Sequence, residues 1–250
     1  MTGGKEMHYV MSDLHGDYQS YLKMLEQIQF TKEDVLYLLG DVIDRGSEPI
    51  ALLKDIKDRE NIIFLLGNHE DMMLRALKKS CNNLQDLITS TEMKRWNRNG
   101  GMATLEQFIR LEQPGQQDLI HFLEESWLVL PQIEVNQQHF YLVHACPGEM
   151  VYHEPLKYKD ATEDEIHQMV WDRRCLEEWK LPESYQNYDP NTILLFGHTK
   201  TNSFMEQYPS KIMYFPKQKA YDVDCFGQLG CVCLETLEQY YVSQATGYNC

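Results

Sequence analysis

The sequence lacks long hydrophobic runs, and even its longest apolar stretches are only as long as Val35–Leu39 and Ile62–Leu66. A helix that crosses a bilayer needs roughly 20 apolar residues, so a membrane span is excluded. The N-terminal residues Met1 to Glu6 contain no apolar segment, so no secretory signal is expected. Gly and Pro are also few, at 14 and 9 of 250 residues, which excludes a collagen-like or disordered chain.

Basic residues are scarce, because 23 Lys and Arg accompany 38 Asp and Glu and give a formal net charge of −15. Proteins that bind a nucleic-acid duplex neutralise its phosphates with clustered Lys and Arg, so nucleic acid is not expected as a partner. A local site for one phosphate stays compatible with this charge. The hydrophobic fraction of 43% is that of a globular protein, and the length permits one large domain or two small ones.

The seven cysteines form an odd and scattered set in a chain without a readable export segment. This pattern favours reduced thiols in a cytoplasmic protein over a disulfide framework. Cys231 and Cys233 fall on one face of an expected strand. With Cys225 they could bind a metal, but packing in the core is the favoured interpretation.

Short apolar runs predict the strands of the central sheet. Five of them are Met7–Met11, Val35–Leu39, Ile62–Leu66, Phe140–Val143 and Ile193–Phe196. Residues with helical spacing separate the first three runs, which predicts the βαβ rhythm of an α/β fold with buried parallel strands. Near the C-terminus, Leu229–Leu234 and Gln239–Val242 are expected to pair as an antiparallel hairpin.

The helices expected elsewhere complete a single domain over residues 1–250. The segment from about 78 to 131 is predicted to be a mainly helical insertion that lies over the core. Within it, Trp96–Gly101 is an expected loop that either shapes access to a site or forms an ordinary turn. Ser47 is predicted to cap one helix, and a capping box at Thr162–Glu165 predicts the start of another.

Each of the five strands is followed by a loop with metal-capable side chains. These side chains are Asp13, His15, Asp41, Asn68, His144 and His198. Because ligands bind at the carboxyl ends of strands in open α/β sheets, residues far apart in sequence are expected to converge. Carboxylate, imidazole and carboxamide donors suit Mn, Fe or Zn, and this set is too large for one catalytic zinc. It suits two divalent metals that share Asp41.

The loops also resemble a known family. Ser12–Gly16, Gly40–Gly46 and Gly67–Glu70 are similar to the three signature blocks of the PPP family of metal-dependent serine/threonine protein phosphatases, and two later blocks begin at His144 and Gly197. The order matches, and the short length resembles the bacterial and bacteriophage branch. The resemblance implies a metallophosphoesterase-type β-sandwich of mixed sheets flanked by helices.

The resemblance also implies a role for each site residue. Asp13, His15 and Asp41 would bind the first metal, and Asp41 would bridge to a second metal held by Asn68, His144 and His198. His69 would be the general acid, oriented by Asp44. Arg45 and Arg173 would bind the phosphate, with Arg174 as the alternative to Arg173, and Asn68 would also contact the substrate. Glu70 is expected to be structural, or to support the ligands, and not to bind metal.

The implied reaction is hydrolysis of phosphoserine and phosphothreonine by a hydroxide that bridges two divalent metals, of which Mn is favoured and Fe or Zn is possible. The partner would be a phosphorylated protein or a small phosphoester. The alternatives are a symmetrical dinucleoside polyphosphate hydrolase on the same scaffold and a non-catalytic phosphate-binding module. Ser12 and Cys146 depart from the family pattern without removing a ligand. The pair Asp222 and Asp224 resembles a haloacid-dehalogenase motif only faintly, and the oligomeric state stays open.

Overall fold

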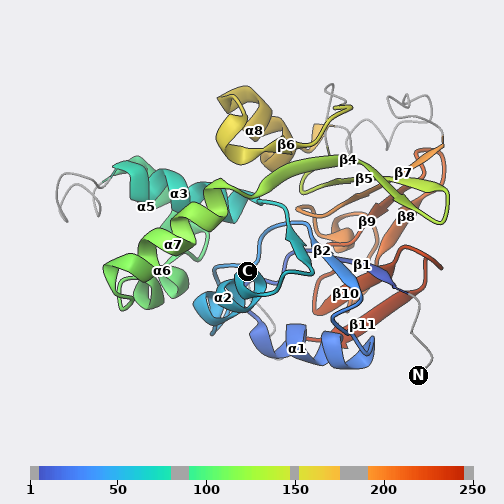
Figure 1. Ribbon diagram of the computed structural model, residues 1–250, viewed down its shortest axis with the longest axis horizontal. Helices are drawn as coiled ribbons and strands as arrows, with labels where there is room; N and C mark the ends of the chain where they lie inside the picture. Colours follow the sequence, from blue (N-terminus) through green and yellow to red (C-terminus); the bar gives the residue numbers. More distant parts are fainter. Residues whose placement is uncertain (1–5, 80–89, 147–151, 175–190, 245–250) are drawn as a thin grey trace.

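The computed structural model describes residues 6–79, 90–146, 152–174 and 191–244. Its strands form two mixed sheets (Figure 1). The first has the order β11-β10-β1-β2-β3 and the second has the order β6-β4-β5-β7-β9-β8. The strands of the first sheet are β1 (His8–Met11), β2 (Val35–Leu38), β3 (Ile62–Phe64), β10 (Gln228–Cys233) and β11 (Gln239–Ser243). Those of the second are β4 (Trp127–Val135), β5 (Gln138–Val143), β6 (Leu156–Lys157), β7 (Thr192–Phe196), β8 (Met213–Phe215) and β9 (Ala220–Asp222).

The two sheets pack face to face, as the expected sandwich requires. Val10 and Val232 from the first sheet share one buried cluster with Leu142 and Leu195 from the second. The alternate residue Met11 instead joins the core beneath the helices, because successive side chains of a strand point to opposite faces. Strands β1, β2 and β3 are parallel and β10 pairs with β11 antiparallel, so the predicted βαβ rhythm and the hairpin are confirmed.

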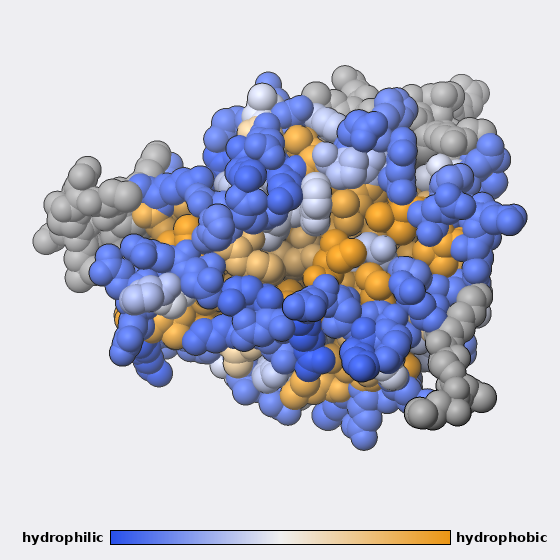
Figure 2. All heavy atoms as spheres, viewed as in Figure 1, coloured by the Kyte–Doolittle hydropathy of each residue, from blue (hydrophilic) through white to orange (hydrophobic). Residues whose placement is uncertain are grey.

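Helices flank the sandwich on its outer faces (Figure 1). They are α1 (Tyr18–Gln27), α2 (Pro49–Asp58), α3 (Asn68–Lys79), α5 (Thr91–Arg98), α6 (Met102–Phe108), α7 (Gln113–Glu124) and α8 (Glu163–Trp171). Hydrophilic residues cover most of the face in Figure 2, and hydrophobic residues gather in a band across its middle. Among the described residues, none of the helices combines the length and the apolar character that a bilayer crossing needs.

The structure corrects two details of the sequence interpretation and confirms a third. The helical segment ends at α7, because β4 begins at Trp127 inside the second sheet and the insertion therefore stops short of residue 131. The cap of α2 is Glu48 and not Ser47, since Pro49 occupies the first helical turn, where its fixed φ is favourable. The capping box of Thr162 and Glu165 is confirmed at the start of α8.

Candidate active site

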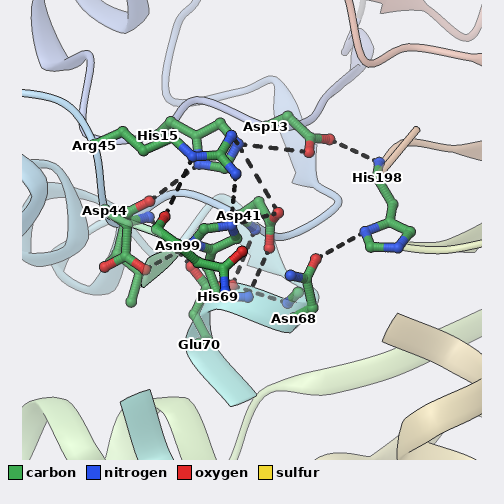
Figure 3. Close-up of polar contacts among 12 residues, drawn as sticks. Asp13, His15, Asp41, Asp44, Arg45, Asn68, His69, Glu70, Asn99 and His198 are labelled. Atoms are coloured by element: carbon green, nitrogen blue, oxygen red, sulfur yellow. Dashed lines mark hydrogen bonds and ion pairs between the residues drawn. The ribbon is translucent and has the colours of Figure 1, made fainter. Parts of the chain in front are cut away.

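The loops after the strands bring the six expected ligands together. Asp13 and His15 follow β1, Asp41 follows β2, and Asn68 begins α3. His144 and His198 follow β5 and β7 of the second sheet. Figure 3 shows five of these ligands turned towards a common centre, with Asp13 and His198 on one side and Asp44 and Arg45 on the other; the five are Asp13, His15, Asp41, Asn68 and His198. A cavity of about 460 Å³ is lined by five of the six, which are Asp13, His15, Asp41, Asn68 and His198.

The backbone at this centre is held in an unusual conformation. Left-handed φ values between 46° and 71° occur at six of the predicted site residues: Asp13, His15, Asp41, Asp44, Arg45 and His198. Residues other than glycine rarely adopt this region, and the cost persists only where the surrounding structure enforces it. Strain of this kind concentrates at functional sites, which agrees with the location inferred from the sequence.

Glu70 ties two of these loops together. Its carboxylate accepts hydrogen bonds from four backbone N–H groups, those of Asp41, Val42, Ile43 and Gly67. Gly67 also packs closely here, because an added Cβ would lie 2.3 Å from Asp41 Oδ1. A carboxylate engaged in this way supports the ligands and does not bind metal itself, in line with its predicted structural role.

Four acceptor atoms converge on one side of the centre. Asn68 Oδ1 lies 3.0 Å from His144 Nε2 and 2.8 Å from His198 Nδ1. Asp41 Oδ1 lies 3.4 Å from the same His144 nitrogen. The side chains of Asp41, His144 and His198 therefore form a group that could hold a metal ion.

The opposite ring nitrogens explain why a cation fits there. His144 Nδ1 donates a hydrogen bond to the carbonyl of Leu39, and His198 Nε2 donates one to the carbonyl of Trp171 at 3.3 Å. Burial lowers the pKa of both imidazoles, which keeps them neutral. The inner nitrogens then carry lone pairs that face the Asn68 oxygen with no proton between them. This donor set suits a divalent cation, and carbonyl partners of this kind orient metal-binding histidines in general.

The other side of the centre has looser geometry. His15 Nε2 lies 4.0 Å from Asp13 Oδ1 and 4.0 Å from Asp41 Oδ2, while its Nδ1 donates 3.3 Å to the Ile43 carbonyl. The geometric group that could hold a metal here is His15, Asp41 and His69, without Asp13. The second oxygen of Asp13 accepts from the Ser12 hydroxyl at 2.5 Å and the His198 amide at 3.1 Å.

His69 differs from the other three histidines of the site in the group that its Nδ1 contacts. Its Nδ1 lies 2.6 Å from Asp44 Oδ2, so a carboxylate and not a carbonyl backs the ring. Asp44 is fully buried and also accepts from Trp96 Nε1 and from the Thr104 hydroxyl. Burial raises the pKa of Asp44 to about 7, and these two hydrogen bonds act in the opposite direction. The Nε2 atom of His69 is left to face Arg45 and the cavity.

The arginines line the cavity from two directions. Arg45 donates to His15 Nε2 at 2.8 Å and to His69 Nε2 at 3.1 Å, so a cation at His15 requires Arg45 to release that ring. Arg173 lines the cavity and donates to the His198 carbonyl and the Thr199 hydroxyl. Arg174 instead pairs with Asp172 at 2.7 Å. This arrangement favours Arg173 over Arg174 as the second phosphate-binding residue, which stays a prediction.

The sequence interpretation missed several residues of the site. Trp96 and Thr104 come from the helical insertion and hold Asp44, so the Trp96–Gly101 stretch is more than an ordinary turn. Asp224 and Lys200 line the cavity as well. The loop expected at Trp96–Gly101 is confirmed only for Asn99–Gly101, because Trp96 to Arg98 form the end of helix α5.

The cysteines correct one expectation. Cys146 is disulfide-bonded, so the expectation of reduced thiols is wrong at this position. Cys231 and Cys233 are free and buried in the core beneath the helices. Cys225 packs with the cluster between the sheets, on the other face, so these three do not converge as a metal site.

The sequence match decides the family. Residues 9–227 match the family described as calcineurin-like phosphoesterase. The chain belongs to this family. The resemblance drawn from the sequence blocks is thereby confirmed at the level of the family and of its fold.

The relatives of this calcineurin-like phosphoesterase chain include proteins named as serine/threonine phosphatases and proteins named as symmetrical tetraphosphatases. Serine/threonine-protein phosphatase 2 of Escherichia coli is 28% identical over 76% of this chain and 78% of its own. The symmetrical bis(5'-nucleosyl)-tetraphosphatase of Wigglesworthia glossinidia brevipalpis is 34% identical, but the match covers 35% of each chain. A Saccharomyces cerevisiae serine/threonine phosphatase structure shares the fold, with a TM-score of 0.61, 12% identity and coverage of 99% and 83%. The chain is therefore a member of the calcineurin-like phosphoesterase family with residues that could hold metal ions.

Proposed function

We propose that this phosphoesterase hydrolyses phosphoserine and phosphothreonine monoesters with the help of two divalent metal ions, of which Mn is the favoured identity. The observation that carries the proposal is the convergence of acceptor atoms from Asp41, Asn68, His144 and His198 beside two cavity arginines. The match to a serine/threonine phosphatase over most of both chains supports the substrate class. The sequence match to the bis(5'-nucleosyl)-tetraphosphatase covers a smaller part of the chain.

The reaction requires charge neutralisation, an activated water and protonation of the leaving oxygen. Two divalent cations bound at this centre would supply the first two. Arg45 and Arg173 offer forked donors that match the oxygens of a phosphoryl group. Asp44 holds the Nδ1 side of His69, so Nε2 is the atom available to give a proton to the departing oxygen of serine.

The experiment compares a phosphoserine peptide with diadenosine tetraphosphate at equal enzyme and metal concentrations. The proposal expects a higher kcat/KM for the phosphopeptide. A higher value for diadenosine tetraphosphate would assign the scaffold to cleavage of phosphoanhydrides, and binding of both without turnover would make the protein a phosphate-binding module. Elemental analysis of the reconstituted protein tests the metals, with two divalent ions per chain expected.

A further inference from the structure

Lys200 is a cation of the site that the proposed roles do not use. It lines the main cavity of about 460 Å³ together with Arg45 and Arg173. It also lines a smaller cavity of about 20 Å³ that shares Asp13, His15, Arg45 and Asp224 with the main one. The smaller cavity therefore adjoins the candidate metal centre on the side of Lys200.

The backbone around Lys200 is fixed by contacts on both sides. The His198 amide donates to Asp13 at 3.1 Å, which anchors the preceding turn. Thr201 is fully buried, its amide donates to the Asp224 carbonyl at 2.9 Å, and its hydroxyl lies 2.7 Å from the Ser210 hydroxyl. The lysine side chain thus starts from a rigid point beside the ligands, and residues on rigid supports are the ones that recognise ligands with precision.

The ammonium group is directed by an aromatic ring. Lys200 Nζ lies 4.8 Å from the centroid of the Phe226 ring, within the range of a cation–π interaction. Phe226 lines the smaller cavity and its amide donates to the Ser210 hydroxyl at 2.7 Å, so this ring is also held in place. The positive charge is consequently kept at the junction of the two cavities.

Lys200 adds a third positive charge to the lining of the main cavity. Arg45 and Arg173 are the two forked donors suited to the oxygens of the phosphoryl group under attack. Asp224 is a buried carboxyl group that lines the same junction. In a protein with a net charge of −15, a substrate with additional negative charge is repelled unless a local cation compensates.

We propose that Lys200 is a specificity-determining residue that binds a second anionic group next to the phosphoryl group under attack. The inference rests on the proposed function and narrows its substrate class to phosphoesters with an adjacent negative charge. That charge has two chemical sources, an acidic side chain that flanks phosphoserine in a peptide or the next phosphate of a polyphosphate chain.

The test compares Lys200→Met with Lys211→Met in the full-length, metal-loaded protein. Lys211 is a matched control, because its ammonium also lies over an aromatic ring, Tyr241 at 5.8 Å, but it lines neither of the two cavities. The substrates are nitrophenyl phosphate, a phosphoserine peptide with neutral flanks, the same peptide with glutamate flanks, and diadenosine tetraphosphate. Lys211→Met is expected to leave all four kcat/KM values near those of the wild type.

Lys200→Met is expected to lower kcat/KM about tenfold more for substrates with a second anion than for nitrophenyl phosphate, as for the loss of one charge-assisted hydrogen bond. A selective loss for the glutamate-flanked peptide identifies an acidic neighbour as the source, and one for diadenosine tetraphosphate identifies a phosphate. Raised ionic strength should reduce the selectivity of the wild type more than that of the variant.

Equilibrium binding gives a second readout without turnover. The dissociation constants of inorganic phosphate and of methylenediphosphonate are compared for the same three proteins, so any removal of metal by the diphosphonate is common to all. Lys200→Met should weaken methylenediphosphonate about tenfold more than phosphate. Equal changes for both probes, or equal losses for all four substrates, would overturn the proposal for Lys200. A failure of the proposed function is distinct, because it would appear as poor phosphopeptide turnover in the wild type itself.

Discussion

Replacement of His69 by asparagine tests whether this residue is a proton donor or a metal ligand. Its Nδ1 lies 2.6 Å from Asp44, and its Nε2 lies 3.8 Å from Asp41 Oδ2 at the edge of the cavity. The first contact suits an acid that serves the leaving group. The second places His69 in the geometric group that could hold a metal.

The two roles predict different kinetics. Serine leaves as a poor alkoxide and needs a proton, whereas nitrophenolate leaves readily without one. General acid catalysis contributes typically 10²–10⁴-fold, so we expect His69→Asn to lower kcat on phosphoserine by about that factor. On nitrophenyl phosphate the loss should stay below about tenfold. A difference of about 100-fold between the substrates corresponds to about 2.7 kcal/mol of transition-state stabilisation.

The assay measures kcat on both substrates and the metal content of the same preparation. Asp44→Asn serves as a companion variant, because it removes the charge behind the imidazole and should show the same pattern more weakly. Metal content should stay at two ions per chain in both variants. Equal losses on the two substrates, or a His69→Asn protein with one metal ion, would refute the assignment of His69 as the acid.

Three further experiments test the remaining assignments. Asp41→Asn should bring the metal content below two ions per chain in elemental analysis, since this carboxylate faces both groups of ligands; two retained ions would contradict the bridging role. Arg173→Ala should raise KM or lower kcat about tenfold or more. Arg174→Ala should keep kinetic constants near those of the wild type in the same assay, because the guanidinium of Arg174 pairs with Asp172. The reverse result would assign phosphate binding to Arg174. Trp96→Phe removes the indole donor to buried Asp44 and should cost about 1–3 kcal/mol in the free energy of unfolding, measured by urea titration, with phosphoserine turnover more affected than nitrophenyl phosphate turnover; unchanged stability and turnover would show that this contact is dispensable.

The strands that position the site were readable because burial makes them uniform. β1, β2 and β3 are parallel and lie within the sandwich, so each is a continuous apolar run. β4 was not predicted, because Pro131 interrupts its sequence and its pairing with β5 shifts register between Leu130 and Ile133. Proline is tolerated in a strand at such an irregularity, but the sequence alone does not mark it as one. β9 is too short to stand out, at three residues.

The ligand loops could be predicted from the sequence, whereas the contacts that support them could not. Loops that follow parallel strands must meet at one sheet edge, so topology alone brings Asp13 and Asp41 together. No such rule connects Asp44 with Trp96 and Thr104, which lie 52 and 60 residues away on the helical insertion. Their contact depends on how α5 and α6 pack against the core. The insertion is therefore part of the site, although its sequence has no motif that reveals this.

The partner of each imidazole separates the predicted acid from the predicted ligands. A backbone carbonyl behind His15, His144 and His198 accepts a hydrogen bond from one ring N–H, so the lone pair of the other ring nitrogen faces inward, which suits a metal ligand. A carboxylate behind His69 accepts a hydrogen bond from its Nδ1 and favours the protonated ring, against the lowering of the pKa of His69 by burial, and this partner suits a proton donor. Distance alone does not make this distinction, since His69 lies as close to Asp41 as His15 does. The chemistry of the atom behind each ring therefore assigns the roles that proximity leaves open, and the metal content of His69→Asn measures whether that assignment holds.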